Sequence, residues 1–206
     1  MGLGNVIVIG AVGIISRVFL KVFSRTTVVN YDRLLKYLVE REKDQPVITL
    51  MNHSSTLDDP MLWGLVPLRT LFSWNSNIRW VMGAKELTFT NPLTAWFFTN
   101  GRTIPTVRGH GIFQPAVNEA IRRMRDEGAW IHVFPEGYVN QGGAGMRPLR
   151  WGVARIISAS KSAKFPTVLP IWHTGEAHIP HHTSSCCCCY YYYYYQWRED
   201  TCSNAN

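Results

Sequence analysis

Short apolar segments rich in β-branched residues alternate along this chain with longer segments of helical periodicity, and this alternation limits the possible folds more than any other feature. Five segments are typical of buried strands, namely 46–51 (PVITLM), 78–83 (IRWVMG), 103–107 (TIPTV), 130–134 (WIHVF) and 167–171 (TVLPI). Helices are expected at 31–42, 60–66, 91–98, 114–128 and 148–160. The pattern predicts an α/β fold in which helices flank a sheet and polar loops follow the strands.

The length of 206 residues fits one domain of ordinary size, preceded by an apolar segment. Residues 3–15 are strongly apolar, and the chain continues to Arg25 with Arg17 and Lys21 about a helical turn apart. Because residues 3–15 alone are too short to span a bilayer comfortably, we expect residues 1–28 to form a membrane-associated helix that lies partly in one leaflet. An ordinary signal anchor is the alternative, and the absence of acidic residues before Asp32 is also typical of an organelle-targeting leader.

The C-terminal segment, residues 176–206, differs in composition from the rest of the chain. Runs of cysteine at 186–189 and of tyrosine at 190–195 carry neither helical nor strand periodicity. We expect this segment to be a low-complexity, disordered tail without a packed core, which leaves residues 29–175 as the main domain.

Charge and cysteine content exclude several classes of function. The chain carries 21 Lys and Arg residues against 14 Asp and Glu residues, so its surface suits an anionic lipid. The basic residues are dispersed, without a long basic arm or a nucleic-acid-binding signature, and we expect no nucleic-acid partner. No cysteine precedes Cys186, so the main domain has neither a cysteine nucleophile nor a cysteine ligand for zinc, and no metal site is expected.

The stretch NHSSTLDDP, residues 52–60, places a histidine and two carboxylates directly after the first predicted strand of the main domain. Asp59 suits the N-cap of a helix that has Pro60 in its first position, which leaves Asp58 free to turn back toward His53. The Asp58 carboxylate could then accept the Nδ1 proton of His53 and keep Nε2 available as a base. The alternative is a polar strand-to-helix turn in which the histidine is incidental.

Two further predicted strands end in residues suited to a phosphate-bearing substrate. Arg108 follows the strand at 103–107, and a guanidinium can grip a phosphate with two parallel hydrogen bonds. Glu136 follows the strand at 130–134, where it could orient Arg108 or accept a hydrogen bond from a substrate hydroxyl, and amides near Gly137 could hold an anion. A base, a cation and a carboxylate at three strand ends fit transfer of an acyl group to a hydroxyl on a phosphate-bearing molecule.

Four blocks together, NHSSTLD, IPTVRG, FPEG and VLPIWH, resemble the motifs of the glycerolipid acyltransferases of the lysophosphatidic-acid acyltransferase type, in their usual order. The resemblance covers residues 29–175 and implies a mixed central sheet flanked by helices. It implies that His53 is the general base, that Asp58 orients it, that Arg108 binds phosphate, and that Glu136 and Gly137 help to hold the glycerol backbone. It also implies that the reaction needs no cofactor, no metal and no acyl-enzyme.

Longer segments, such as RWVMGAKELTFTNPLTAWFFTNG, resemble the phospholipid–lysophospholipid transacylases of that family. This implies CoA-independent acyl transfer in cardiolipin remodelling, with cardiolipin, monolysocardiolipin and phosphatidylcholine as substrates. The implied location is the outer or inner mitochondrial membrane on its intermembrane-space side, with peripheral or monotopic attachment. An acyl-CoA-dependent lysophospholipid acyltransferase and an inactive, truncated membrane-associated isoform are the alternatives. Relatives of this type continue with ordered sequence after the last block, so we expect that the reading frame or splicing changed near Glu176.

Other residues allow two interpretations. Arg147 and Arg150 could contact a second phosphate of a dianionic lipid or be solvated. His132 lies within an apolar strand and is expected in the core, whereas His173 is left open between a structural role and the site. Four aromatic residues could rest at a lipid interface or in the core, namely Trp63, Trp96, Phe97 and Phe98.

Overall fold

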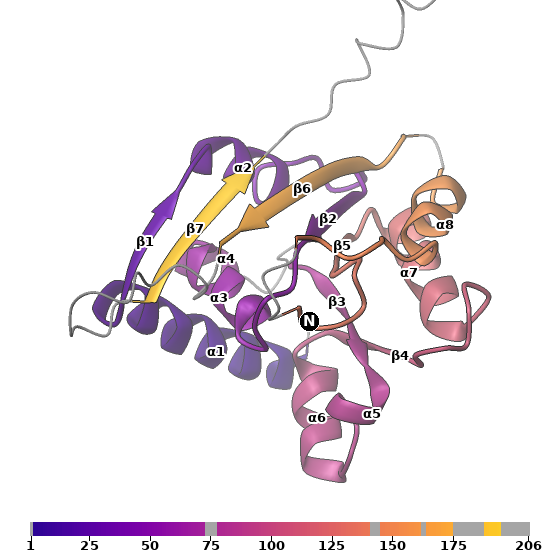
Figure 1. Ribbon diagram of the computed structural model, residues 1–206, viewed down its shortest axis with the longest axis horizontal. Coiled ribbons are helices and arrows are strands. Elements are labelled where there is room, and N and C mark those ends of the chain that lie inside the picture. Colours follow the sequence, from indigo (N-terminus) through magenta and orange to yellow (C-terminus); the bar gives the residue numbers. More distant parts are fainter. Residues whose placement is uncertain (1, 73–77, 141–144, 162–163, 175–187, 195–206) are drawn as a thin grey trace, which may run out of the picture.

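A seven-stranded mixed sheet with helices on both faces forms the centre of the computed structural model, which describes residues 2–72, 78–140, 145–161, 164–174 and 188–194 (Figure 1). The strand order is β1-β7-β6-β2-β5-β3-β4, and all neighbours are parallel except β6 and β7. The strands are β1 (Ser24–Val28), β2 (Val47–Met51), β3 (Trp80–Ala84), β4 (Thr103–Thr106), β5 (Trp130–Val133), β6 (Thr167–His173) and β7 (Cys188–Tyr194). This architecture confirms the predicted α/β class.

Eight helices accompany the described part of the sheet. They are α1 (Leu3–Val22), α2 (Tyr31–Leu38), α3 (Asp58–Leu65), α4 (Leu68–Leu71), α5 (Lys85–Thr88), α6 (Pro92–Asn100), α7 (Pro115–Glu127) and α8 (Gly152–Ala159). One core lies between the sheet and α1–α4 and contains Val47 and Met51 of β2. The other lies between the sheet and α7–α8 and contains Ile48, which projects from the opposite face of the same strand.

All five strands predicted from apolar runs are confirmed, with ends that differ by a few residues. β1 and β7 were not predicted because neither segment has an apolar pattern, and each pairs with a segment far away in the sequence. β7 lies within the stretch expected to be a low-complexity tail. The remaining residues of that tail lie outside the described ranges, so the division of the chain at residues 28 and 175 stays a prediction.

Helix α3 begins earlier than the sequence pattern predicted. Leu57 is its N-cap and Asp58 its first residue, so the expectation of an N-cap at Asp59 was wrong. Pro60 is therefore the third helical residue, where its missing N–H removes no bond because the first N–H groups of a helix have no partner within it. The shift makes Asp58 part of the helix that follows the strand β2, instead of part of the loop.

Helix α1 packs closely on α3. A Cβ atom at Gly64 would lie 2.9 Å from the backbone carbon of Ser16 and from Leu20 Cδ1, so only glycine allows the two helices to approach this closely. Val8, Ile9 and Leu20 of α1 are buried, whereas Leu3, Ile7 and Ile15 are exposed. By length and composition α1 could cross a membrane, but the same holds for a core helix, and a third of its apolar window is buried.

The turn that joins α7 to β5 requires glycine at residue 128. Gly128 has φ of +57°, and a Cβ atom there would lie 2.4 Å from the carbonyl oxygen of Lys43. We expect Gly128→Ala to lower the free energy of unfolding by roughly 2–4 kcal/mol, from left-handed backbone strain and from the clash. Chemical denaturation in detergent micelles measures this loss.

Gly111→Ala is the matched control, because Gly111 also has a positive φ, of +72°, but a Cβ atom there would meet nothing within 4 Å. Gly111→Ala should lower the free energy of unfolding only by the backbone strain, about 1–2 kcal/mol. Equal losses in the two variants would show that the contact with Lys43 is not limiting.

Candidate active site

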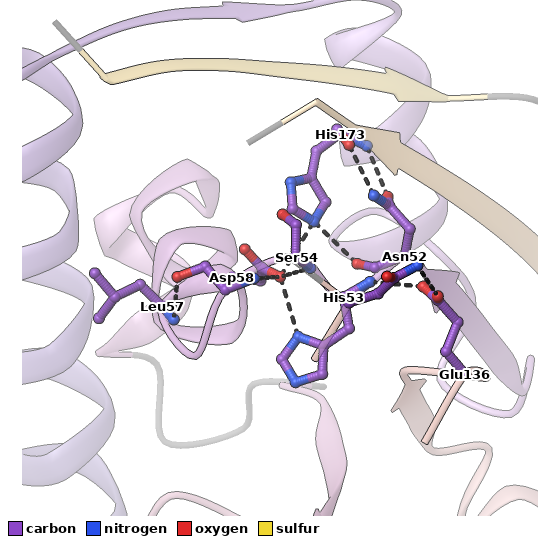
Figure 2. A network of polar contacts seen from close by, with 9 residues as sticks. Asn52, His53, Ser54, Leu57, Asp58, Glu136 and His173 are labelled. Carbon is purple, nitrogen blue, oxygen red and sulfur yellow. Dashed lines mark hydrogen bonds and ion pairs between the residues drawn. The ribbon is translucent and has the colours of Figure 1, made fainter. Parts of the chain in front are cut away.

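The loop between β2 and α3 brings His53 against Asp58 at the carboxyl end of β2. His53 Nδ1 lies 3.0 Å from Asp58 Oδ2, as Figure 2 shows. The backbone amides of Ser54 and Ser55 each donate to the same oxygen at 2.8 Å. The loop thus curls around the carboxylate at the start of α3, where the unpaired N–H groups of the helix also favour negative charge.

Asp58 is fully buried, yet its surroundings favour the ionised form. Burial by itself raises the pKa of the Asp58 carboxyl, but hydrogen bonds from His173 and His53, with the backbone amide of Ser55, outweigh it and lower the pKa to about 2. The carboxylate is therefore charged at neutral pH. It can accept a hydrogen bond from an N–H group of each of the two imidazoles.

The hydrogen bond to Asp58 determines which nitrogen of His53 is available. Because an ionised carboxylate can only accept, Nδ1 of His53 carries a proton, and in the neutral imidazole Nε2 is then the nitrogen that keeps its lone pair. The ring stacks on Phe134 with centroids 3.9 Å apart, and 18% of the side chain is exposed. The exposed part makes His53 accessible to a substrate, and stacking restricts its rotation.

His173, at the end of β6, belongs to the same network. Its Nε2 lies 3.3 Å from Asp58 Oδ2 and 2.9 Å from the carbonyl oxygen of Asn52. The Asn52 side chain also bonds the backbone of His173 in both directions, donating to its carbonyl oxygen at 2.8 Å and accepting from its N–H at 2.9 Å (Figure 2). These contacts tie the ends of β2 and β6 together. The sequence signal was the same as for His53, a histidine at the end of an apolar strand.

Glu136 is a second buried carboxylate, and it holds the loop after β5 against the loop after β2. One oxygen accepts from the backbone N–H of His53 at 3.0 Å. The other accepts from Asn140 Nδ2 at 3.1 Å and from the backbone N–H of Arg147 at 3.0 Å. Both oxygens therefore accept hydrogen bonds from other groups of the protein. No contact between Glu136 and Arg108 supports the suggestion that Glu136 orients Arg108.

Arg108 and Arg150 approach one aromatic ring, that of Tyr138. The guanidinium carbon of Arg108 lies 4.6 Å from the ring centroid, and that of Arg150 lies 5.5 Å from it. Arg108 also pairs with Glu86 of α5 at 3.3 Å. Gly137 has φ of +74°, and a Cβ atom there would lie 3.5 Å from Arg150. Arg108, Gly137 and Arg150 were predicted from separate motifs, and the structure gathers them around Tyr138. The sequence analysis did not single out Tyr138.

Arg147 contributes its backbone N–H to Glu136, and its side chain is exposed. Within the described ranges, no group of three His, Cys, Asp or Glu side chains has an arrangement that could hold a metal ion.

The start of α3 is also held by a pair that sequence reasoning missed. Arg79 is buried, pairs with Asp59, and has its guanidinium carbon 4.0 Å from the ring centroid of Trp63. Burial lowers the pKa of Arg79 to about 10, although Asp59 opposes the shift, so the guanidinium stays charged at neutral pH. Trp63 is consequently a core residue, so of its two interpretations the lipid interface was wrong and the core is confirmed.

His132 is the buried histidine that the sequence placed in the core. It is inaccessible to solvent, and its Nδ1 lies 2.7 Å from Thr49 Oγ1, which also accepts from Trp130 Nε1 at 2.8 Å. Burial lowers the pKa of His132 well below its ordinary value, so the ring is neutral. The core assignment is confirmed.

Comparison with known proteins gives this arrangement a family. The acyltransferase family model matches residues 25–174, which include the whole His53–Asp58–His173 network and the residues around Tyr138. The chain belongs to the acyltransferase family.

Two curated relatives and one solved structure extend this assignment. The chain is 45% identical over 168 residues to tafazzin of Drosophila melanogaster, covering 82% of this chain and 43% of the fly protein. It is 40% identical over 169 residues to N-acylphosphatidylethanolamine synthase of Arabidopsis thaliana, covering 82% of this chain and 58% of the plant protein. The chain thus spans about half the length of the curated relatives it matches.

The fold resembles the crystal structure of the 1-acyl-sn-glycerophosphate acyltransferase PlsC from Thermotoga maritima. The TM-score is 0.55, with 20% identity, over 93% of this chain and 68% of the bacterial chain. This likeness confirms the acyltransferase type of fold.

The ionised state of Asp58 should appear in the pH dependence of stability. Because its folded-state pKa is lowered from 3.8 to about 2, its contribution is complete above pH 4 and is lost as the pH falls through 2. We expect the free energy of unfolding of the wild type to fall by about 2 kcal/mol more over this interval than that of Asp58→Asn. Denaturant unfolding at a series of acidic pH values measures the difference, and parallel curves would contradict it.

Proposed function

We propose that this chain is a membrane-bound acyltransferase that moves a fatty acyl chain between a phospholipid and a lysophospholipid without CoA. The single observation that carries the proposal is the accessible imidazole of His53, held by a buried, ionised Asp58 in a chain of the acyltransferase family. In this proposal residues 1–28 supply the membrane-associated helix α1, residues 29–175 the acyltransferase domain and residues 176–206 a tail, and the two flanking segments also add β1 and β7 to the sheet.

In the proposed reaction, Nε2 of His53 accepts the proton of a lysophospholipid hydroxyl as the hydroxyl oxygen attacks the ester carbonyl of the donor phospholipid. Asp58 stabilises the imidazolium that forms, and it keeps the ring in the required tautomer and orientation. When the tetrahedral intermediate collapses, the ester C–O bond breaks and His53 returns the proton to the leaving oxygen. One ester is broken and one is formed, so the step consumes no cofactor.

Arg108 is proposed to bind the phosphate of a substrate, with Arg150 beside it across Tyr138. Arg108 is partly exposed and its ion pair with Glu86 is also partly exposed, so exchanging Glu86 for a phosphate costs little. Gly137 gives the substrate room next to Arg150, and the buried Glu136 positions the loop that carries His53. Arg147, exposed beside them, is proposed to contact a second phosphate of a dianionic lipid.

The likeness to tafazzin supports cardiolipin and monolysocardiolipin, with phosphatidylcholine, as the substrates of CoA-independent remodelling. It also supports a place at the outer or inner mitochondrial membrane, on the side of the intermembrane space, with peripheral or monotopic attachment. The apolar helix α1 supplies the attachment in this proposal.

Transfer of the acyl chain to an amine is a second candidate reaction, and one of the relatives favours it. The plant relative is named for synthesis of N-acylphosphatidylethanolamine, in which the acceptor is an amine. Nε2 of His53 could take a proton from the ammonium headgroup, and the neutral amine nitrogen would then attack the ester carbonyl; the ester C–O bond breaks as the amide forms, and the proton goes to the leaving oxygen. An acyl-CoA-dependent acyltransferase and an inactive fragment are the remaining alternatives.

One assay separates these possibilities. Purified chain is incubated in vesicles that contain phosphatidylcholine with a labelled acyl chain, together with monolysocardiolipin and phosphatidylethanolamine, and the labelled lipids are separated. We expect label in cardiolipin without added CoA. Label only in N-acylphosphatidylethanolamine would favour the second reaction, transfer only from labelled acyl-CoA would favour the CoA-dependent enzyme, and no transfer under any condition would refute the proposed activity.

The base is tested by substitution. His53→Ala should lower the rate by about 10²–10⁴-fold, because the hydroxyl loses its proton acceptor, and Asp58→Asn should leave a weaker residual rate, because the ring can adopt the other tautomer. Rates of label transfer measure both effects. His110→Ala, at an exposed loop histidine, is the matched control and should keep the wild-type rate. A fully active His53→Ala enzyme would show that the base is elsewhere.

A further inference from the structure

The segment of α5 and α6 is unusual for the surface of a protein in water. From Leu87 to Gly101 the sequence, LTFTNPLTAWFFTNG, contains no charged residue. Water-facing helices normally carry charged side chains on the face turned away from the core. The absence of charge over this stretch therefore indicates a surface that meets something other than water.

These residues are also exposed. Neither α5 nor α6 contains a buried residue, and four large apolar side chains stand out from them, namely Leu87 (62% exposed), Leu93 (75%), Trp96 (52%) and Phe97 (40%). Contiguous exposed apolar residues of this size mark interaction sites. Single exposed apolar residues would need no such explanation.

Local interactions define α6 without help from a core. Asn91 is its N-cap and accepts from the N–H of Thr94 at 3.0 Å, Pro92 follows in the first turn, and Phe97 and Phe98 meet edge to face with centroids 5.3 Å apart. The helix can therefore present its apolar side chains without burying them. Substitutions on its exposed face should leave the fold intact.

The position of α6 connects it with α1. Asn5 Nδ2 donates to the carbonyl oxygen of Asn100 at 2.9 Å, so the end of α6 meets the start of α1, whose Leu3 and Ile7 are exposed. Figure 1 shows α6 projecting from the sheet beside the N-terminal end of α1. The exposed apolar residues of the two helices thus belong to neighbouring parts of one surface.

The other end of the segment lies beside the candidate site. α5 begins directly after β3, and Glu86 in its first turn pairs with Arg108, the proposed phosphate-binding residue. Lys85 and Arg108 place cations next to the apolar stretch. A surface that is apolar in the middle and basic at the edge complements a phospholipid leaflet, in which acyl chains lie behind anionic headgroups.

We propose that α5 and α6 form a second membrane contact besides α1, with Leu87, Leu93, Trp96 and Phe97 inserted among the headgroups and upper acyl chains of one leaflet. Tryptophan and phenylalanine next to Thr and Asn suit this interfacial zone. The contact goes beyond the proposed acyl transfer and does not require it. It would hold the Arg108 end of the site at the level of the headgroups.

The test is binding of the full chain to vesicles of phosphatidylcholine with phosphatidylglycerol, which contain no lysophospholipid acceptor, so that binding is measured apart from acyl transfer. The bound fraction is determined by flotation over a range of lipid concentrations. At the lower concentrations binding through α1 alone is incomplete, so a loss of the second contact can be detected. The double variant Leu93→Glu, Trp96→Glu should need about tenfold more lipid for half-maximal binding, or more, because two inserted apolar side chains become charged.

Phe165→Glu is the matched control. Phe165 is 49% exposed and lies two residues before β6, and its carbonyl oxygen accepts from Gln45 Nε2. It therefore lies at the amino edge of the parallel strands, opposite the edge from which α5 leaves β3. This variant should bind vesicles as the wild type does.

Three outcomes would overturn the proposal. These are unchanged binding of the α6 variant, an equal loss in Phe165→Glu, or a wild-type oligomer in detergent that the α6 variant converts to monomers while vesicle binding stays the same. The last result would assign the surface to contacts between copies of the chain. Circular dichroism of the variants verifies that they are folded.

Discussion

Burial of the Asp58 charge is the constraint on which the site depends. A carboxylate without access to water is costly unless hydrogen bonds replace its hydration. Here two backbone amides, from Ser54 and Ser55, and two imidazoles, from His53 and His173, surround one oxygen. These donors come from the β2–α3 loop and from the end of β6, so the charge holds separate elements together. The orientation of His53 is a consequence of satisfying Asp58.

Glu136 repeats the principle one strand away. It is buried, and it accepts from the backbone of His53 and of Arg147 and from the side chain of Asn140. Two internal carboxylates thus fix the polar loops at the carboxyl edge of the sheet, and the buried Arg79 holds the start of α3 in the same region through its ion pair with Asp59. Irregular loops gain a defined geometry in this way without a large apolar core of their own. Rigid supports of this kind are what a proton-transfer site requires.

The site combines a partly exposed base with basic residues that are proposed to meet a lipid headgroup. His53 is partly exposed, and its backbone bonds Glu136 and Asn140 of the loop after β5, the loop that also carries Tyr138 with Arg108 and Arg150 around its ring. α5 starts beside Arg108 and leads into the uncharged α6. Under the proposed membrane contacts, a headgroup that binds the arginines would belong to the leaflet that α1 and α6 are proposed to enter. In this proposal the protein meets its substrate at the carboxyl edge of the sheet.

Local sequence alone determined the five strands β2 to β6, the main helices and the pairing of His53 with Asp58, because periodicity and a spacing of five residues act within a short stretch of chain. It misplaced the start of α3, where Asp58 is already helical while its carboxylate bonds His53, Ser54 and Ser55, and where Asp59 pairs with the distant Arg79 instead of capping the helix. Only the tertiary structure placed His173 against Asp58, brought in Arg79 and Tyr138, and set β1 against β7. Each of these depends on contacts between residues far apart in the chain, and a pattern read within one segment carries no information about which distant segment will lie beside it.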